Sequence, residues 1–396
     1  MTQQTVLICG GGIGGLAAAL VLARDGYRVE VFEQSDAFRE IGAGIQIGPN
    51  AFRMFEHLGL TAAIDRVAYY PGNLCMRDVR TGEVVATVPV SAQAKGSYGY
   101  PYGVIYRADL HSVLLDACQS LPAVGLHTRA KIERFEHDAG GVSLALADGR
   151  RFEGAALIGA DGLWSTVRQA IVGDGPPRVS GHVAYRAVLP MSEVPKHLYS
   201  PDVVLWGGEK THLVHYPLRR GELYNLVAVF HSDHYEEGWN IFGDPHELNE
   251  RFADAVGPVR ELLGKIETWK MWVLCDRDPV RNWSQGRVTL LGDAAHPMLQ
   301  YLAQGACMAI EDAAVLGAAL RRAEGDFGRA FEEYQRVRYL RTGRVQLTAR
   351  FYGDIYHASG VARELRNKMF QSGAESAGFA GLGWLYQGVD PETVFA

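Results

Sequence analysis

Residues 6–15 read VLICGGGIGG, an apolar run that leads directly into a glycine-rich turn. The run is typical of a buried parallel strand, and residues 16–24 follow it with the Ala/Leu-rich spacing of a helix. A second strand is predicted over residues 28–33, so a β-α-β unit is complete within about 30 residues. This is the context that a dinucleotide-binding fingerprint requires.

The glycine-rich turn carries the G-x-G-x-x-G spacing of that fingerprint. Its first glycine permits a tight turn, its second lets the backbone approach a pyrophosphate, and its third lets helix and strand pack closely. The pyrophosphate is expected at the helix N-terminus, where free N–H groups need acceptors. Glu33 ends the second strand and is expected to bind the hydroxyls of an adenosine ribose. The predicted cofactor-binding residues of this unit are Gly10, Gly12, Ile13, Gly14, Gly15 and Glu33.

The composition of the 396 residues is that of an ordinary globular protein, with 47% apolar residues, 21% charged residues and a net charge of -6. This balance supplies no basic face for nucleic acid and no polybasic membrane anchor. The five cysteines are scattered without a C-x-x-C pair, which predicts reduced thiols in a cytoplasmic protein and no metal site. The apolar stretch 5–23 is interrupted by glycines and follows no basic residue, so neither a membrane span nor a signal peptide is predicted.

The spacing of apolar residues changes along the chain. A glycine-rich segment over 34–50 is expected to be irregular, and a helix is expected from Arg107 to about residue 118. Four strands are then predicted, followed by a helix near 248–255; the strands cover 183–188, 203–206, 212–216 and 223–231. We therefore predict an α/β fold in which a Rossmann-like domain (1–72, 104–178 and 277–344) is interleaved with an antiparallel-sheet substrate domain (73–103 and 179–276) and followed by a C-terminal helical region (345–396).

Two further signatures lie far along the chain: GADGLWSTVR at residues 159–168 and LGDAAHP at residues 291–297. With these motifs in this order, the chain resembles the class A flavoprotein aromatic hydroxylases, single-component FAD monooxygenases, over essentially its whole length. In that family the two signatures are a D-G motif and a G-D motif. The resemblance implies that the Rossmann-like domain binds FAD and that NADH or NADPH is a transient co-substrate. It also implies that O2 reacts with reduced flavin to give a hydroxylating C4a-hydroperoxide.

The same resemblance assigns cofactor contacts to single residues. It implies that Asp293 binds a ribitol hydroxyl of FAD and that Arg107 contacts the cofactor near its pyrophosphate or ribitol. Asp161 is assigned to FAD and nicotinamide dinucleotide binding, although an aspartate before glycine is also an ordinary turn signal. Gly44, in the glycine-rich segment, and Gly305, close to the third signature, complete the predicted cofactor-binding residues.

A closer resemblance is to the 3-hydroxybenzoate 6-hydroxylases, which convert 3-hydroxybenzoate to gentisate by hydroxylation para to the phenol. It is carried by residues 211–230, 292–306 and 384–386. This resemblance places the predicted catalytic residues His212 and Gln300 at the phenol end of a small aromatic substrate, with Tyr216 in the same pocket. Strand alternation separately puts His212 and Tyr216 on one face of the sheet and His215 on the other.

Several points stay open. The chain departs from the family at Met298 and Gln304, where the relative has Pro and Ser. The substrate carboxylate is not located: Arg186, Arg219 and Arg220 are candidates, and each is equally a surface charge. The alternative functions are a salicylate 1-hydroxylase, which forms catechol and CO2, and an FAD-dependent oxidoreductase that inserts no oxygen. The C-terminal helices predict a homodimer.

Overall fold

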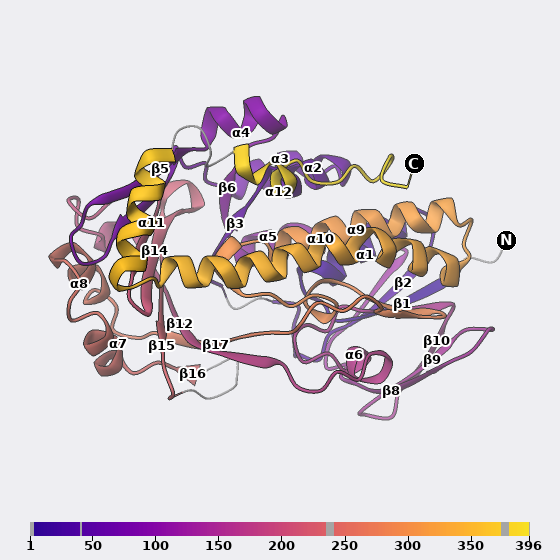
Figure 1. Ribbon diagram of the computed structural model, residues 1–396. Helices are drawn as coiled ribbons and strands as arrows, with labels where there is room; N and C mark the ends of the chain where they lie inside the picture. The colour runs from indigo at the N-terminus through magenta and orange to yellow at the C-terminus, as the bar shows by residue number, and fades with distance from the viewer. Residues whose placement is uncertain (1–3, 40–41, 235–240, 374–379, 396) are drawn as a thin grey trace.

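The computed structural model contains two large sheets with helices packed along them, and it describes residues 4–39, 42–234, 241–373 and 380–395 (Figure 1). The first sheet has the order β18-β19-β11-β1-β2-β7, and only the β18–β19 pair is antiparallel. Its strands are Thr5–Cys9 (β1), Arg28–Phe32 (β2), Val124–His127 (β7), Ala156–Gly159 (β11), Ser284–Gln285 (β18) and Val288–Leu290 (β19). Helix α1 (Ile13–Arg24) joins β1 to β2, so the predicted β-α-β unit and the α/β fold are confirmed.

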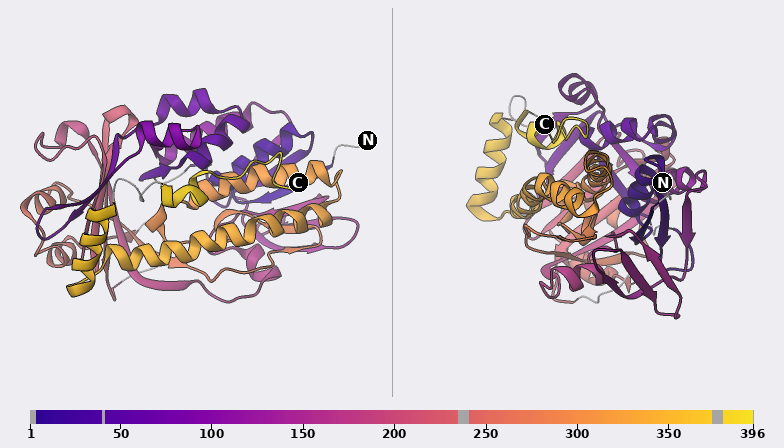
Figure 2. Two further views of the ribbon diagram at one scale, coloured as in Figure 1. Left: turned by 45° about the horizontal axis from the view of Figure 1, so that its top comes forward. Right: turned by 90° about the vertical axis from the view of Figure 1, so that its right-hand side faces the viewer.

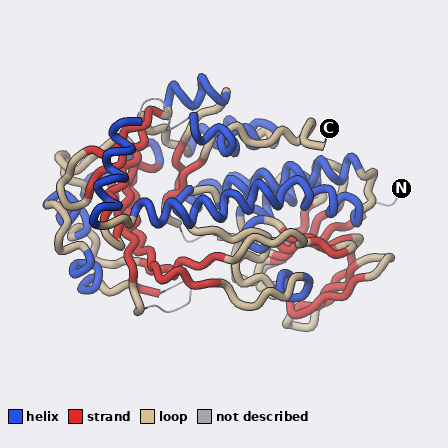
Figure 3. Tube along the Cα trace, viewed as in Figure 1, coloured by secondary structure: helices blue, strands red, loops and turns tan. Residues whose placement is uncertain are grey.

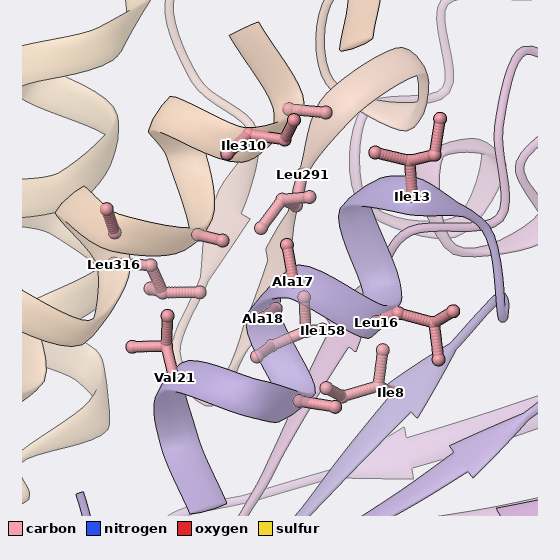
Figure 4. Packing of buried hydrophobic residues seen from close by; sticks show 14 of the residues in the cluster. Ile8, Ile13, Leu16, Ala17, Ala18, Val21, Ile158, Leu291, Ile310 and Leu316 are labelled. Carbon is pink, nitrogen blue, oxygen red and sulfur yellow. The ribbon is translucent and has the colours of Figure 1, made fainter. Parts of the chain in front are cut away.

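Small side chains let α1 pack closely on this sheet and on α9 (Gly305–Arg322). Ala17 and Ala18 have no exposed surface, and Figure 4 shows them among Ile158 of β11 and Leu316 of α9. Removing this apolar surface from water stabilises the contact between strand, turn and helix. The other elements of this region are α5 (Arg107–Gln119), α6 (Thr166–Ile171) and a small sheet of β8 (Ile132–His137), β9 (Val142–Leu146) and β10 (Arg151–Gly154).

The second sheet has eight strands in the order β16-β17-β12-β15-β14-β13-β4-β5. Neighbouring strands are antiparallel except for the parallel pair β13 and β4. The strands are Asn73–Asp78 (β4), Val84–Pro89 (β5), Arg178–Pro190 (β12), Val203–Gly208 (β13), Thr211–Leu218 (β14), Leu223–His231 (β15), Ile241–Phe242 (β16) and Lys270–Asp276 (β17). Strand β12 is longer than predicted because it pairs with both β15 and β17.

The two faces of the second sheet have different partners. Helices α7 (Pro245–Arg251) and α8 (Gly257–Leu263) share one buried apolar cluster with the sheet, which includes Leu213 and Phe230. His215 lies on this covered side, where its Nδ1 is 2.7 Å from the Tyr224 hydroxyl. The opposite face, which carries His212, is left for the site described below.

The glycine-rich segment is more regular than predicted. It contains β3 (Gly44–Ile47), which pairs antiparallel with β6 (Gly103–Tyr106), and it leads into α2 (Pro49–His57). The pairing partner lies far along the chain, so local composition does not reveal the strand. Two further short helices, α3 (Thr61–Val67) and α4 (Ser91–Tyr98), lie on the same side of the molecule as α2, at the top of Figure 1.

The described part of the C-terminal region contains α10 (Phe327–Tyr356), α11 (Gly360–Gly373) and α12 (Gly383–Tyr386). Helix α10 runs unbroken for 30 residues beside α9, so the predicted boundary at residue 345 lies inside a helix (Figure 2). Figure 3 shows the strands in two groups, with α10 running from one toward the other. No helix in the part of the chain that the structure describes is long and apolar enough to cross a membrane.

Candidate active site

One cavity of about 1350 Å³ connects the first sheet to the open face of the second. This volume exceeds the roughly 300–1,000 Å³ of a site for one small ligand, so it can hold a dinucleotide together with an aromatic ring. We call it the central cavity. The predicted site residues that line it are Gly10, Gly12, Ile13, Gly14, Glu33, Gly44, Arg107, Asp161, His212, Tyr216, Asp293, Gln300 and Gly305.

The fingerprint turn has the close contacts that its glycines predict. Gly10 has a φ of +105°, and a Cβ at this residue would lie 2.2 Å from the carbonyl oxygen of Ala160. Gly15 does not line the cavity; a Cβ there would lie 2.0 Å from the carbonyl oxygen of Gly10. Glu33 holds the turn as well, because its Oε2 accepts a 3.0 Å hydrogen bond from the N–H of Gly11. The N-terminus of α1 therefore opens into the cavity, a geometry that suits a pyrophosphate.

Asp161 of the second signature forms the turn that starts α6. Its carboxylate accepts hydrogen bonds from the Ser165 hydroxyl at 2.5 Å and from the N–H groups of Thr166 at 2.7 Å and Val167 at 3.2 Å. Burial raises the pKa of Asp161 above its ordinary value. The turn-forming role is therefore present, and a contact of Asp161 with a cofactor stays a prediction.

Arg168 joins the second signature to the third. Its Nη1 donates to the carbonyl oxygens of Ala294 at 2.9 Å and Ala295 at 2.7 Å, and its Nη2 lies 2.6 Å from Asp174. The side chain is 1% exposed. Sequence reasoning did not assign this role, although the motif contains the arginine, because the receiving carbonyls lie more than a hundred residues later in the chain.

The third signature forms a short turn that presents Asp293 to the central cavity. The N–H of Gly292 donates to Oδ2 of Asp312 at 3.0 Å, and His296 Nε2 lies 2.5 Å from the same oxygen. Gly305 begins α9, so the N-terminus of an 18-residue helix also faces the cavity. Backbone N–H groups at such a terminus favour electron-rich groups.

A buried ion network is linked to this turn through Asp312, which accepts the N–H of Gly292. Arg338 lies 2.6 Å from Glu311 and 2.6 Å from Asp312, and all three side chains have no exposed surface. Arg341 adds a second ion pair to Glu311 at 2.6 Å. Burial alone raises the pKa of a carboxyl. Here the charges of Arg341 and Arg338 lower the pKa of Glu311 to about 2. The charges of His296 and Arg338 lower the pKa of Asp312, also to about 2. These residues were missed because nothing local in the sequence distinguishes them from helix surface charges.

His212 and Tyr216 come from β14 and line the cavity. His212 is 2% exposed, and burial lowers its pKa to about 3, so the ring is neutral near pH 7. Its Nδ1 lies 2.7 Å from Nε2 of His357. Tyr216 lies against Gly44, where a Cβ would stand 2.6 Å from the tyrosine ring, and Asn225 Oδ1 accepts the N–H of Gly44 at 2.7 Å.

Arg186 is the cationic candidate that reaches the cavity. It donates a short hydrogen bond to Oε1 of Gln300, and its guanidinium lies 5.2 Å from the centre of the Trp272 ring. Its Nε is buried and has no hydrogen-bond partner among the described residues. Arg219 is instead paired with Asp109 at 2.6 Å, and its side chain is 43% exposed. Arg186 is therefore the half-buried candidate that has no ion pair among the described residues.

Arg220 also lies outside the central cavity. It is exposed and donates to the carbonyl oxygen of Asp65 at 3.3 Å. Burial lowers the pKa of Arg186 to about 10, so its guanidinium still carries a charge at neutral pH. Gln300 uses its carbonyl oxygen on this arginine, so its NH2 group is the part of the side chain that can donate to another group.

Comparisons with known proteins agree with this geometry. The sequence profile of a family described as an FAD binding domain matches residues 3–336. The 3-hydroxybenzoate 6-hydroxylase of Polaromonas naphthalenivorans (strain CJ2) is 46% identical over 381 residues, which cover 96% of this chain and 95% of that protein. The crystal structure of Klebsiella pneumoniae HpxO with FAD and uric acid has a TM-score of 0.85 at 27% identity and covers 99% of this chain and 96% of that chain. A salicylate hydroxylase substrate complex has a TM-score of 0.82 at 26% identity, covering 100% and 97% of the two chains.

The matches extend through the fingerprint, the two later signatures and the second sheet, so the likeness covers both walls of the central cavity. FAD fits the cavity because two helix N-termini and the Asp293 carboxylate line it. The chain belongs to the FAD-binding-domain family and is an FAD-dependent aromatic monooxygenase related to the 3-hydroxybenzoate 6-hydroxylases.

Proposed function

We propose that this enzyme hydroxylates 3-hydroxybenzoate para to its hydroxyl group, with NADH or NADPH and O2 as co-substrates. Carbon 6 of this substrate is para to the hydroxyl at carbon 3, so the product is 2,5-dihydroxybenzoate, which is gentisate. One observation carries the proposal: the neutral, buried His212 and the half-buried Arg186, which has no ion pair among the described residues, share the cavity face of one sheet.

His212 is the proposed base for the phenol. Its Nδ1 is engaged by His357, which leaves Nε2 as the nitrogen for a ligand in the central cavity. A phenolate is a much better nucleophile at its para carbon than a phenol, so removal of the proton prepares the ring for attack on an electrophilic oxygen. Gln300 supplies an NH2 donor to the resulting phenolate, and Tyr216 orients the ring from the same face.

Arg186 is the proposed partner of the substrate carboxylate. Arg186 lines the cavity, its Nη2 donates to Gln300, and its Nε has no hydrogen-bond partner among the described residues, so the guanidinium has further N–H groups for a ligand. An arginine–carboxylate pair in a water-poor site gives both binding energy and a fixed orientation. Arg186 on β12 is in register with Val214 on β14, so His212 lies two strands away and two residues along, about 12 Å at the backbone. Adjacent hydroxyl and carboxyl groups, as in salicylate, suit this spacing less well than groups placed meta to each other.

The cofactor contacts follow from the walls of the cavity. The fingerprint turn would hold the FAD pyrophosphate and Glu33 the ribose, while Asp293 and Arg107 would bind the ribitol side. Asp161, Gly44 and Gly305 complete the proposed set. When bound, FAD supplies the oxygen-activating redox chemistry, and the enclosing protein keeps water from the reacting groups.

We also propose a cytoplasmic homodimer. Large apolar side chains are exposed along one side of α10, namely Leu340, Leu347 and Phe351, and along α11, namely Val361 and Leu365. Their spacings of four and seven residues put them on one stripe of each helix. Exposed apolar stripes of this kind are typical of protein–protein contacts. The five free cysteines are consistent with a reducing compartment.

The proposal is tested by NADH and NADPH oxidation with the purified holoenzyme and chromatographic identification of the products. The substrates are 3-hydroxybenzoate, salicylate and 4-hydroxybenzoate, with a reaction lacking substrate as the control. Gentisate from 3-hydroxybenzoate is the expected result. Catechol from salicylate would show that the enzyme is instead a decarboxylating hydroxylase. Hydrogen peroxide as the sole product with every substrate would contradict oxygen insertion.

A further inference from the structure

Four histidines lie together behind the phenol side of the central cavity: His182, His212, His231 and His357. The ring centres of His182 and His357 are 4.7 Å apart, and those of His182 and His231 are 5.4 Å apart. His212 lines the cavity, whereas the other three do not and are partly exposed. Their accessible surface therefore lies outside the central cavity. The described side chains form no metal-ligand set here.

The contact between His212 and His357 links the cavity to this outer side. Nδ1 of His212 and Nε2 of His357 are 2.7 Å apart, so one of the two rings donates to the other. Nδ1 of His357 is buried and has no hydrogen-bond partner among the described residues. Buried polar atoms are almost always satisfied, so an unpartnered nitrogen indicates a position for water or for a transferred proton.

We propose that His357 is the second member of a proton relay, which takes the substrate's phenolic proton from His212 and delivers it to water at the outer histidines. The proposal rests on the proposed function, because it needs a substrate with an ionisable hydroxyl at His212. His357 does not touch the substrate and acts as a positioning and relay residue.

The transfers balance without any further reactant. The phenolic O–H bond breaks as Nε2 of His212 takes the proton, and the Nδ1–H bond of His212 breaks as Nε2 of His357 takes its proton. The proton on Nδ1 of His357 leaves to water, so the cavity holds a phenolate and both imidazoles are neutral again. The same path in reverse returns a proton to the oxygen of the product and restores the original tautomers.

The surroundings of His357 favour passing a proton on over holding it on the ring as an imidazolium. The groups that face it are His212 from β14, His182 from β12 and His231 from β15, with the Tyr301 ring 5.8 Å away. Burial and these imidazoles keep the pKa of His357 well below its ordinary value, so an imidazolium does not persist there. On its remaining side, Arg366 of α11 donates to the carbonyl oxygen of the preceding residue at 3.2 Å.

The decisive variant is His357→Gln, measured on the FAD-loaded enzyme. Glutamine still accepts the hydrogen bond of His212 but cannot pass a proton on. Release of a proton on binding 3-hydroxybenzoate, followed with a pH-indicator dye in weak buffer by stopped flow, is expected to slow by about 10- to 100-fold. The Michaelis constant is expected to change little. His246→Gln, the same substitution at an exposed histidine of α7, serves as the matched control.

A second measurement uses the unaltered enzyme and so does not depend on folding of the variant. The rate of phenol deprotonation is recorded in mixtures of H2O and D2O. Concerted transfer of the three protons predicts a curved, cubic dependence on the deuterium fraction, and a linear dependence would overturn the relay. If the His357→Gln variant releases the proton at the rate of the wild-type enzyme, the relay is also overturned. Absence of proton release and of gentisate in the wild type would instead refute the proposed function.

Discussion

Replacing Arg338 by methionine tests whether the buried ion network holds the third signature in place. Methionine retains much of the side-chain volume and removes the guanidinium. Glu311 and Asp312 would each lose an ion pair of 2.6 Å while staying fully buried. Arg341 would remain for the first carboxylate and His296 for the second. The substitution therefore isolates the electrostatic contribution of one cation.

The expected cost is that of removing one partner from a buried ion pair, about 3–5 kcal/mol in free energy of unfolding. With an unfolding entropy of about 2.1 cal/mol/K per residue, this lowers the Tm of the 396-residue chain by about 4–6 °C. Since Asp312 also holds the N–H of Gly292, the FAD content should fall with the stability. Arg336→Met, at an exposed position of the same helix, should change the Tm by less than about 1 °C.

The pH dependence has a defined sign. In the wild type the folded-state pKa of Glu311 and of Asp312 is about 2, below the ordinary values of 4.5 and 3.8. Their contribution to stability is therefore present above about pH 4.5 and is lost as the pH falls toward 2. Without Arg338 the pKa values of Glu311 and Asp312 rise. In the variant, protonation therefore removes the destabilising buried carboxylate charges at a higher pH. The Tm gap between the two proteins should narrow from pH 7 to pH 4 in thermal unfolding. A gap under 1 °C at pH 7, or one that does not change with pH, would refute the reasoning.

Four further predictions concern the site and the surface. His212→Ala should lower the hydroxylation rate by about 10²- to 10⁴-fold while the flavin absorbance per protein stays constant, and an unimpaired rate would remove this residue from the mechanism. Gln300→Ala should lower the same rate by about tenfold, the value of one hydrogen bond; an effect on the Michaelis constant alone would assign it to binding. Arg186→Gln should weaken the use of 3-hydroxybenzoate, raising its Michaelis constant by about 10- to 100-fold, but should spare 3-methylphenol, which lacks the carboxylate; equal effects on both would contradict the assignment. Leu347→Glu combined with Phe351→Glu should convert a dimer to monomers in sedimentation velocity, and an unchanged mass would place the interface elsewhere.

Much of the cofactor half of the molecule could be predicted from the sequence. The fingerprint at residues 10–15 is a local pattern, because its glycines are required where the turn leaves no room for a Cβ atom. The strand that carries His212 was also predictable, since alternation decides which side chains share a face. What alternation cannot tell is which face is covered by α7 and α8 and which opens into the cavity.

The assembled site depended on the tertiary structure. Arg186, Arg219 and Arg220 are equivalent in sequence, and only the packing separates the half-buried arginine that lines the cavity from the two exposed ones. Likewise, His357 ends a helix far from His212 in the chain, and the long helix α10 brings it to the end of the second sheet. Local motifs encode backbone conformation because steric limits act between neighbouring residues. Charge pairing and burial depend on which distant segments meet, and that is decided when the whole chain packs.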